Sequence, residues 1–144
     1  MRTTCSPALA GRLRLAVTRT ARRLRQEAGG GLSPSLTAAL ATIERHGPLT
    51  PSEVAARERI QRPTATRVLA RLEEAGLVQR AADPADRRSC LVSASDEGRS
   101  LLAVLRTRKD AFLAQRLDGL SGEEREVLER AAAIFERMLR EGGE

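Results

Sequence analysis

The sequence is poor in the residues from which most catalytic and metal sites are built. Its 144 residues include one histidine, two phenylalanines, and neither tryptophan nor tyrosine. A single histidine cannot assemble the usual zinc or acid–base constellations, and two cysteines, Cys5 and Cys90, are too few for a disulfide framework. The scarcity of aromatic residues removes the stacking platforms of single-strand binders. We therefore expect a protein that is not an enzyme and that has no catalytic residue, metal or cofactor.

Long hydrophobic runs are absent as well. No stretch approaches the roughly 20 apolar residues that cross a bilayer, and residues 1–25 alternate arginine with leucine and alanine instead of building a signal-peptide core. Hydrophobic residues make up 41% of the chain and charged residues 31%, which is enough apolar material for one small domain with helical extensions. We expect a cytoplasmic protein with no membrane partner.

The charge that is present is unevenly distributed. All but one of the 25 basic residues are arginine, whose planar fork of donors suits phosphates and guanine edges. Residues 1–90 hold 16 arginines and eight acidic residues, whereas residues 91–144 hold nine basic and 11 acidic residues. This separation indicates that one part of the molecule faces a polyanion and another does not.

Apolar spacing and breakers predict two helices in the first third of the chain. Leucines and alanines recur at helical spacing over residues 8–26, and the glycines of residues 29–31 end the segment. Ser33 then offers a cap and Pro34 a first helical position. The second helix is expected to end at His46, which we interpret as a helix-end residue and not as a ligand.

The strongest helix-start signal follows. Thr50 can cap a helix that begins at Pro51, Glu53 can close a capping box, and Leu49 can pack on Val54 as a hydrophobic staple. We expect a short third helix ending near residue 59.

The next helix is followed by a hairpin. Pro63 marks the start of a fourth helix, which Gly76 ends, with Leu77 folding back on Leu72 in a Schellman motif. Two extended runs, residues 77–80 and 89–94, flank a polar, basic turn. Cys90 in the second run is expected to be a small buried hydrophobe.

Helical spacing returns in the last third, over residues 96–117 and 123–140, with Ser121 and Glu124 forming a second capping box. The apolar stripes of these segments and of residues 8–26 lie outside the small domain that the middle helices and the hairpin can form. They require a partner, and a second copy of the chain is the commonest one.

This order of elements predicts the fold class, which is mainly α with a small β-hairpin wing: a winged helix-turn-helix flanked by N- and C-terminal dimerisation helices. In such folds the helix before the hairpin enters the major groove and the hairpin reaches toward a minor groove. The sequence therefore favours double-stranded DNA as the partner.

Three stretches carry a specific resemblance: residues 49–55 (LTPSEVA), residues 63–78 (PTATRVLARLEEAGLV) and residues 83–88 (DPADRR), with Gly98 opening the following helix. At this spacing the chain resembles the MarR family of bacterial regulators, the multiple-antibiotic-resistance type. The resemblance covers about residues 33–100 by motif and the rest by helix order. It implies a homodimer on a pseudo-palindromic operator, with a dimerisation helix in residues 1–32, a DNA-binding domain in residues 33–95 and dimerisation helices in residues 96–144.

The resemblance also implies DNA-contacting residues. Arg67 is expected in the groove, while Arg71, deeper along the helix, would contact either a base or a phosphate. In the family pattern Asp86 braces an arginine that enters the minor groove, and Arg87 and Arg88 are equal candidates for it. The expected DNA-binding residues are Thr50, Ser52, Arg62, Pro63, Thr64, Thr66, Arg67, Arg71, Asp86, Arg87 and Arg88.

We expect a sequence-specific transcriptional regulator, a repressor in the first instance. A small hydrophobic or aromatic effector is possible, because family members often bind one, but the sequence names none. One alternative is an architectural protein that coats DNA without sequence preference. Another is a peroxide sensor acting through Cys5, which the absence of tyrosine partners disfavours.

Overall fold

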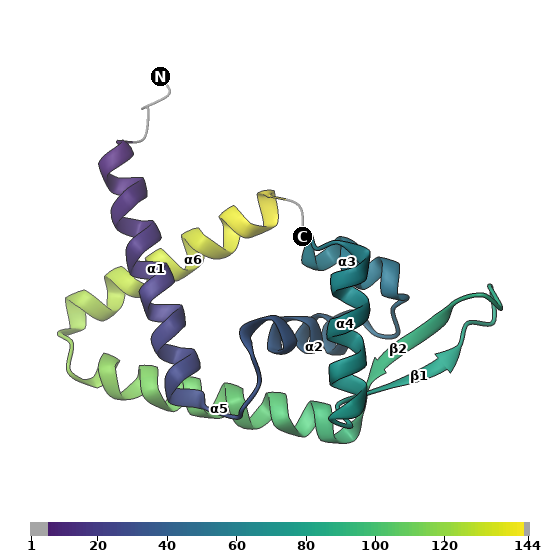
Figure 1. Ribbon diagram of the computed structural model, residues 1–144. Helices are drawn as coiled ribbons and strands as arrows, with labels where there is room; N and C mark the ends of the chain where they lie inside the picture. The colour runs from purple at the N-terminus through teal and green to yellow at the C-terminus, as the bar shows by residue number, and fades with distance from the viewer. Residues whose placement is uncertain (1–5, 143–144) are drawn as a thin grey trace. The chain divides into compact units, whose positions relative to one another are not determined.

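The computed structural model describes residues 6–142 and is mainly helical, with one hairpin (Figure 1). The elements are α1 Pro7–Ala28, α2 Pro34–His46, α3 Pro51–Glu58, α4 Arg62–Glu74, β1 Val78–Ala82, β2 Cys90–Ala94, α5 Asp96–Asp118 and α6 Gly122–Glu141. The predicted fold class, helices around a hairpin wing, is confirmed. Two compact units form, one ending at Lys109 and the other beginning at Asp110.

Local signals place the helix starts where the sequence predicts them. The Thr50 hydroxyl accepts a hydrogen bond from the Glu53 N–H at 3.2 Å, and the Glu53 carboxylate accepts one from the Thr50 N–H at 2.8 Å. Ser121 and Glu124 form the same reciprocal pair at the start of α6. Each bond satisfies an N–H that the first turn would otherwise leave unpaired, so both predicted capping boxes are confirmed.

The core of the first unit lies among α2, α3, α4 and the base of the hairpin. Its completely buried large side chains are Leu40, Ile43, Val54, Leu69, Leu72 and Val92. Four apolar side chains of α4 face this core, which confirms the stripe expected there: Ala65, Val68, Leu69 and Leu72. Helix α4 is therefore held along its whole inner face, leaving its outer face free.

The chain between α2 and α3 adds a bridge that the sequence analysis missed. Leu49 and Val92 exchange both backbone hydrogen bonds, at 3.0 and 2.7 Å. Leu49 is thus a strand-like partner of β2 as well as a buried neighbour of Val54 in the core. The bridge ties the hairpin to the loop in front of α3.

The end of α4 closes as expected and leads into the hairpin. Gly76 has a φ of 73°. The Leu77 N–H donates to the Leu72 carbonyl at 2.9 Å, and the Gly76 N–H donates to the Glu73 carbonyl. This is the predicted Schellman motif.

The first strand is longer than predicted. β1 continues to Ala82, because Ala81 and Ala82 pair with Leu91 and Cys90 of the antiparallel β2. Sequence reasoning assigned both alanines to the turn, since alanine is a weak strand former and pairing alone decides such positions. In Figure 1 the hairpin starts near one end of α4 and projects sideways, away from the helix.

Cys90 differs from its prediction. It is half-buried, packs against the edge of the core, and its sulfur lies 3.7 Å from Nη1 of Arg80. Arg80 also forms an ion pair with Glu73 at the end of α4. The thiol therefore borders a charged side chain near the turn end of the paired strands, instead of being a fully buried apolar group.

The helices outside this core keep apolar residues on their surfaces. In α1 only Ala28 is buried, and α6 buries no residue at all within the described part of the chain. The exposed large apolar residues of these two helices are Leu9, Leu13, Leu15, Val17, Val127, Leu128, Ile134, Met138 and Leu139. Within residues 6–142, no helix combines the length and apolarity that crossing a membrane requires.

Candidate nucleic-acid interface

The first two turns of α4 present a cationic, polar surface. Arg62, Thr66 and Arg67 are exposed, Thr64 is half-buried, and Pro63 occupies the first turn, where a missing N–H costs nothing. The Thr66 hydroxyl donates to the Arg62 carbonyl at 3.0 Å. No side chain caps this helix N-terminus, so its free N–H groups and dipole favour an anion there.

The arginines of this region are not neutralised by neighbours. In the described part of the chain four ion pairs form: Arg23 with Glu27, Arg80 with Glu73, Arg99 with Asp96, and Arg106 with Glu44. None of them uses the exposed arginines of α3, α4 and the wing tip. Those arginines are Arg57, Arg59, Arg62, Arg67, Arg71, Arg87 and Arg88.

The two carboxylates of the wing tip accept hydrogen bonds from backbone groups. At the wing tip, Asp83 accepts the Ala85 N–H at 2.9 Å and Asp86 accepts the Arg88 N–H at 2.9 Å. These two consecutive turns shape the main chain and leave the guanidinium groups of Arg87 and Arg88 exposed. Asp86 thus braces the backbone of Arg88 and not an arginine side chain.

The two expected residues of α3 have different environments. Thr50 is committed to the capping box, which accounts for its presence without DNA. Ser52 is exposed and its hydroxyl has no hydrogen-bond partner among the described residues. Ser52 is therefore the freer of the two to contact a phosphate.

The structure brings some of the expected residues together and separates others. Arg62, Thr66 and Arg67 share the first two turns of α4, whereas Arg71 lies in its last turn. Arg87 and Arg88 follow β1, which begins beyond the opposite end of that helix. The cations therefore form two groups, one on the recognition helix and one on the wing.

Sequence reasoning missed two arginines at the helix-turn-helix turn. Arg57 lies in the last turn of α3, and Arg59 ends the helix with a φ of 54°, the sole positive φ of a non-glycine residue in residues 6–142. The clustering of Arg57, Arg59 and Arg62 within six positions was the available signal. The left-handed conformation of Arg59 could not be foreseen, because arginine rarely adopts it.

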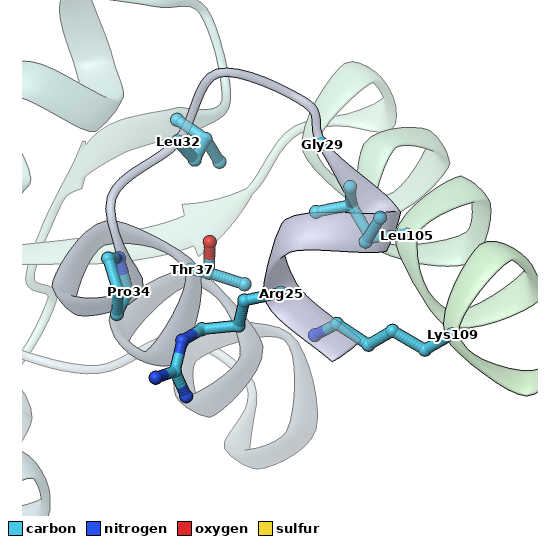
Figure 2. Close-up of a pocket in the computed structure, with 8 residues that line it drawn as sticks. Arg25, Gly29, Leu32, Pro34, Thr37, Leu105 and Lys109 are labelled. Atoms are coloured by element: carbon cyan, nitrogen blue, oxygen red, sulfur yellow. The ribbon is translucent and has the colours of Figure 1, made fainter. Parts of the chain in front are cut away.

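A small pocket lies where the end of α1, the start of α2 and α5 meet (Figure 2). Leu32 and Leu105 contribute apolar surface, and Arg25 and Lys109 contribute positive charge. Its volume of about 40 Å³ is far below the roughly 300 Å³ at which ligand sites begin. In a single chain the pocket accommodates water, not an aromatic effector.

A metal site receives no support from the described residues. No group of three or more histidine, cysteine, aspartate or glutamate side chains in residues 6–142 could hold a metal ion. His46 is the exposed last residue of α2, as predicted. Cys5 lies outside the described residues, so its redox role stays a prediction.

A helix-turn-helix with an uncovered cationic recognition helix, followed by a hairpin with a cationic tip, defines a winged-helix DNA-binding protein. Residues 32–90 match the model of the MarR family. The chain belongs to this family of transcriptional regulators. The family and the relatives named below are regulators of transcription and not enzymes.

Three relatives illustrate the similarity. The chain is 40% identical over 134 residues to the uncharacterized HTH-type transcriptional regulator Mb0904 of Mycobacterium bovis, covering 92% of this chain and 94% of that protein. It is 32% identical to the HTH-type transcriptional repressor MdtR of Bacillus subtilis, covering 65% and 61%. A crystal structure from Pseudomonas aeruginosa, described as a transcriptional regulator, matches with a TM-score of 0.82 and 36% identity over 92% and 95% of the two chains.

Proposed function

We propose that the protein acts as a homodimeric repressor that binds a pseudo-palindromic operator. The observation that carries this proposal is the contrast between two surfaces of one chain. The outer face of α4 and the wing tip hold exposed arginines that form no ion pair within residues 6–142, while α1 and α6 expose apolar stripes. The first surface suits DNA, and the second requires burial by another protein surface.

The exposed apolar residues of α6 support a second copy of the chain as the protein surface that buries them. Val127, Ile134 and Met138 of α6 are 53%, 46% and 56% exposed, although they share one helix face. Monomeric soluble proteins rarely expose a continuous apolar stripe of this kind. A two-fold dimer would bury it and present two copies of α4 to successive major grooves.

The same contrast assigns the parts of the chain to dimerisation or to DNA binding. Residues 1–32 and 96–144 would serve mainly in dimerisation, and residues 33–95 in DNA binding. The proposed DNA contacts are the expected set: Thr50, Ser52, Arg62, Pro63, Thr64, Thr66, Arg67, Arg71, Asp86, Arg87 and Arg88. A bacterial regulator of transcription must reach chromosomal DNA, which places its action in the cytoplasm.

Repression is supported by similarity alone, through the relative named as a repressor. An effector has no support from the pocket of a single chain, because about 40 Å³ is too little for an aromatic ring.

Selection of bound fragments from genomic DNA tests the proposal. The purified protein should enrich fragments that carry two inverted half-sites one or two helical turns apart. A salt titration should then separate the selected duplex from random DNA by at least about 1,000-fold in affinity at physiological salt. Equal affinity for both duplexes would instead identify an architectural protein, and a monomeric mass with tight binding would exclude the dimer.

A further inference from the structure

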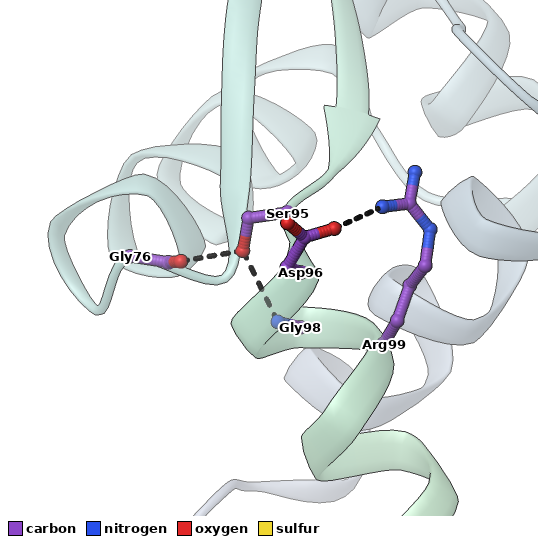
Figure 3. A network of polar contacts seen from close by, with 5 residues as sticks. All are labelled: Gly76, Ser95, Asp96, Gly98 and Arg99. Atoms are coloured by element: carbon purple, nitrogen blue, oxygen red, sulfur yellow. Dashed lines mark hydrogen bonds and ion pairs between the residues drawn. The ribbon is translucent and has the colours of Figure 1, made fainter.

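A buried serine joins the end of the recognition helix to the start of α5 (Figure 3). Ser95, between β2 and α5, is 8% exposed and is the one buried polar residue among those described. Its hydroxyl donates to the Gly76 carbonyl at 2.6 Å and accepts from the Gly98 N–H at 3.1 Å. Its own N–H donates to the Leu77 carbonyl at 3.0 Å.

The backbone is unusually close at this junction. A Cβ added to Gly98, in the first turn of α5, would lie 2.2 Å from the Leu77 carbonyl oxygen and 3.2 Å from Leu40 Cδ1. The first of these contacts is with backbone, which no side-chain rotation can relieve. The first turn of α5 therefore rests directly on the chain that leaves α4.

Ser95 does more than an ordinary cap does. A capping hydroxyl needs only to accept an N–H, as Ser121 does from the Glu124 N–H at the start of α6. The Ser95 hydroxyl accepts an N–H in the same way. It also donates a hydrogen bond to the carbonyl of Gly76, which lies 19 residues earlier, just after the end of α4. One hydroxyl therefore bridges two helices, because a hydroxyl is both donor and acceptor.

A small change in the direction of α5 at the Ser95 bridge becomes a large displacement at its far end, because α5 is long. Its 23 residues extend about 34 Å, so a slack of about 5° at one end displaces the other by about 3 Å. That displacement is close to one base-pair step of about 3.4 Å. α5 begins in the unit that contains α4 and ends in the unit that contains α6.

We propose that Ser95 is a positioning residue, which fixes the direction of α4 against α5 and thereby the half-site spacing that the dimer accepts. The proposal rests on the dimeric operator binding proposed above. Ser95 touches no DNA in this scheme. It acts through α4, so its loss should affect the choice between spacings more than affinity for a single half-site.

The test uses the full chain and synthetic duplexes that carry either one selected half-site, two at the selected spacing, or two at that spacing plus or minus one base pair. The spacing ratio is the affinity at the selected spacing divided by the affinity at the shifted spacings. Ser95→Ala should lower this ratio at least fivefold while leaving single half-site affinity within twofold. Ser95→Thr, which keeps the hydroxyl, should restore it.

Ser121→Ala is the matched control, because it removes a cap of the same kind that bridges no second helix. It should lower stability like Ser95→Ala and leave the spacing ratio unchanged. If Ser95→Ala does not fold, Ser95→Cys puts a slightly larger group with weaker hydrogen bonds in the same place and should shift the ratio in the same direction.

Two outcomes overturn the inference in distinguishable ways. An unchanged ratio in a folded Ser95 variant, with a parent that prefers one spacing, shows that Ser95 is only a cap and leaves the dimeric function intact. A parent that binds single and paired half-sites equally overturns the dimeric function itself, and the positioning role falls with it.

Discussion

The recognition helix α4 and the C-terminal helix α6 have the same kind of apolar pattern, but the structure buries the apolar residues of only one of them. α4 buries four apolar residues against α2, α3 and the hairpin, whereas α6 buries none within the described residues. Periodicity in a sequence therefore shows that a helix face needs a partner, but not whether the partner is in the same chain. In α4 the partner is the core, and in α6 we propose that it is a second molecule.

A charge on the α6 stripe should have the largest effect. Ile134→Asp should weaken dimerisation by at least about 3 kcal/mol, because an interface would have to bury an unpaired carboxylate. Sedimentation equilibrium should show a monomer, and binding to paired half-sites should fall with it. Glu129→Lys, on the polar face of the same helix, is the control and should remain dimeric. A dimer that persists in Ile134→Asp would place the interface elsewhere.

A cavity in the core of α4 should be the next largest change. Leu69 is completely buried, and Leu69→Ala should lower the free energy of unfolding by about 2–5 kcal/mol. The loss should be the same at all protein concentrations, whereas that of Ile134→Ala should grow as concentration rises until both proteins are dimeric, because dimer formation contributes to stability by mass action. Denaturant melts at two concentrations distinguish the two. A concentration-dependent Leu69→Ala would remove the contrast between the helices.

The outward faces of the helices should differ too. Arg67→Ala in α4 should weaken specific binding by about 1–3 kcal/mol and relax base preference in the half-site. Arg22→Ala, an equal loss of charge on exposed α1, should change binding much less. Competition binding with operator and random duplexes measures both. Equal losses on the two duplexes for Arg67→Ala would reassign it to phosphate positioning, the role that Arg71 would then share.

Relief of strain in the turn before α4 should give a smaller effect. Arg59 has a φ of 54°, a conformation that costs a non-glycine residue about 1 kcal/mol or more. Arg59→Gly should raise the stability of the folded chain by about 0.5–1 kcal/mol, after the added freedom of the unfolded glycine is counted. Thermal melts would show this as a higher midpoint. Arg57→Gly, in the regular part of α3, should instead destabilise.

The smallest expected effect concerns pH. The hydrogen bond from Arg106, helped by its charge, holds the pKa of Glu44 below its ordinary value of 4.5, against the opposing effect of burial. A carboxyl with a lowered folded-state pKa stabilises the fold above its unfolded pKa, and this contribution is lost as pH falls through the folded value. Because Arg106 is half exposed, it should amount to less than about 1 kcal/mol. Glu44→Gln should reduce the acid sensitivity of stability below pH 5, and an identical pH profile would contradict it.

The features that could be predicted from the sequence are those encoded within a few residues. The capping boxes at Thr50 and Ser121 depend on side chains that bond to neighbouring backbone, and the helix end at Gly76 depends on the positive φ that glycine tolerates. They fixed most helix ends to within two residues. The winged order, with a basic helix before a basic hairpin, followed from these boundaries.

The features that could not be predicted join distant positions. The Leu49–Val92 bridge and the ion pair of Arg106 with Glu44 connect residues 43 and 62 positions apart, and no local pattern specifies such partners. The dual role of Ser95 was hidden for the same reason, since a capping serine and a bridging serine look alike in a sequence. The DNA contacts stay predictions, because side-chain exposure shows which arginines are free but not which atoms they meet.

The glycine connection between α1 and α2 has a consequence for how the molecule comes apart. Gly29, Gly30 and Gly31 all have positive φ, and a side chain on Gly30 would collide with Leu105 at 2.7 Å. Ordering such residues costs about 0.5–1 kcal/mol each relative to alanine. The connection is therefore the natural first point of local opening, where hydrogen exchange and protease cleavage begin while the winged core is still folded. A cut there would leave residues 32–109 intact around their own core. We therefore expect the end of α1 to be the preferred site of protease cleavage.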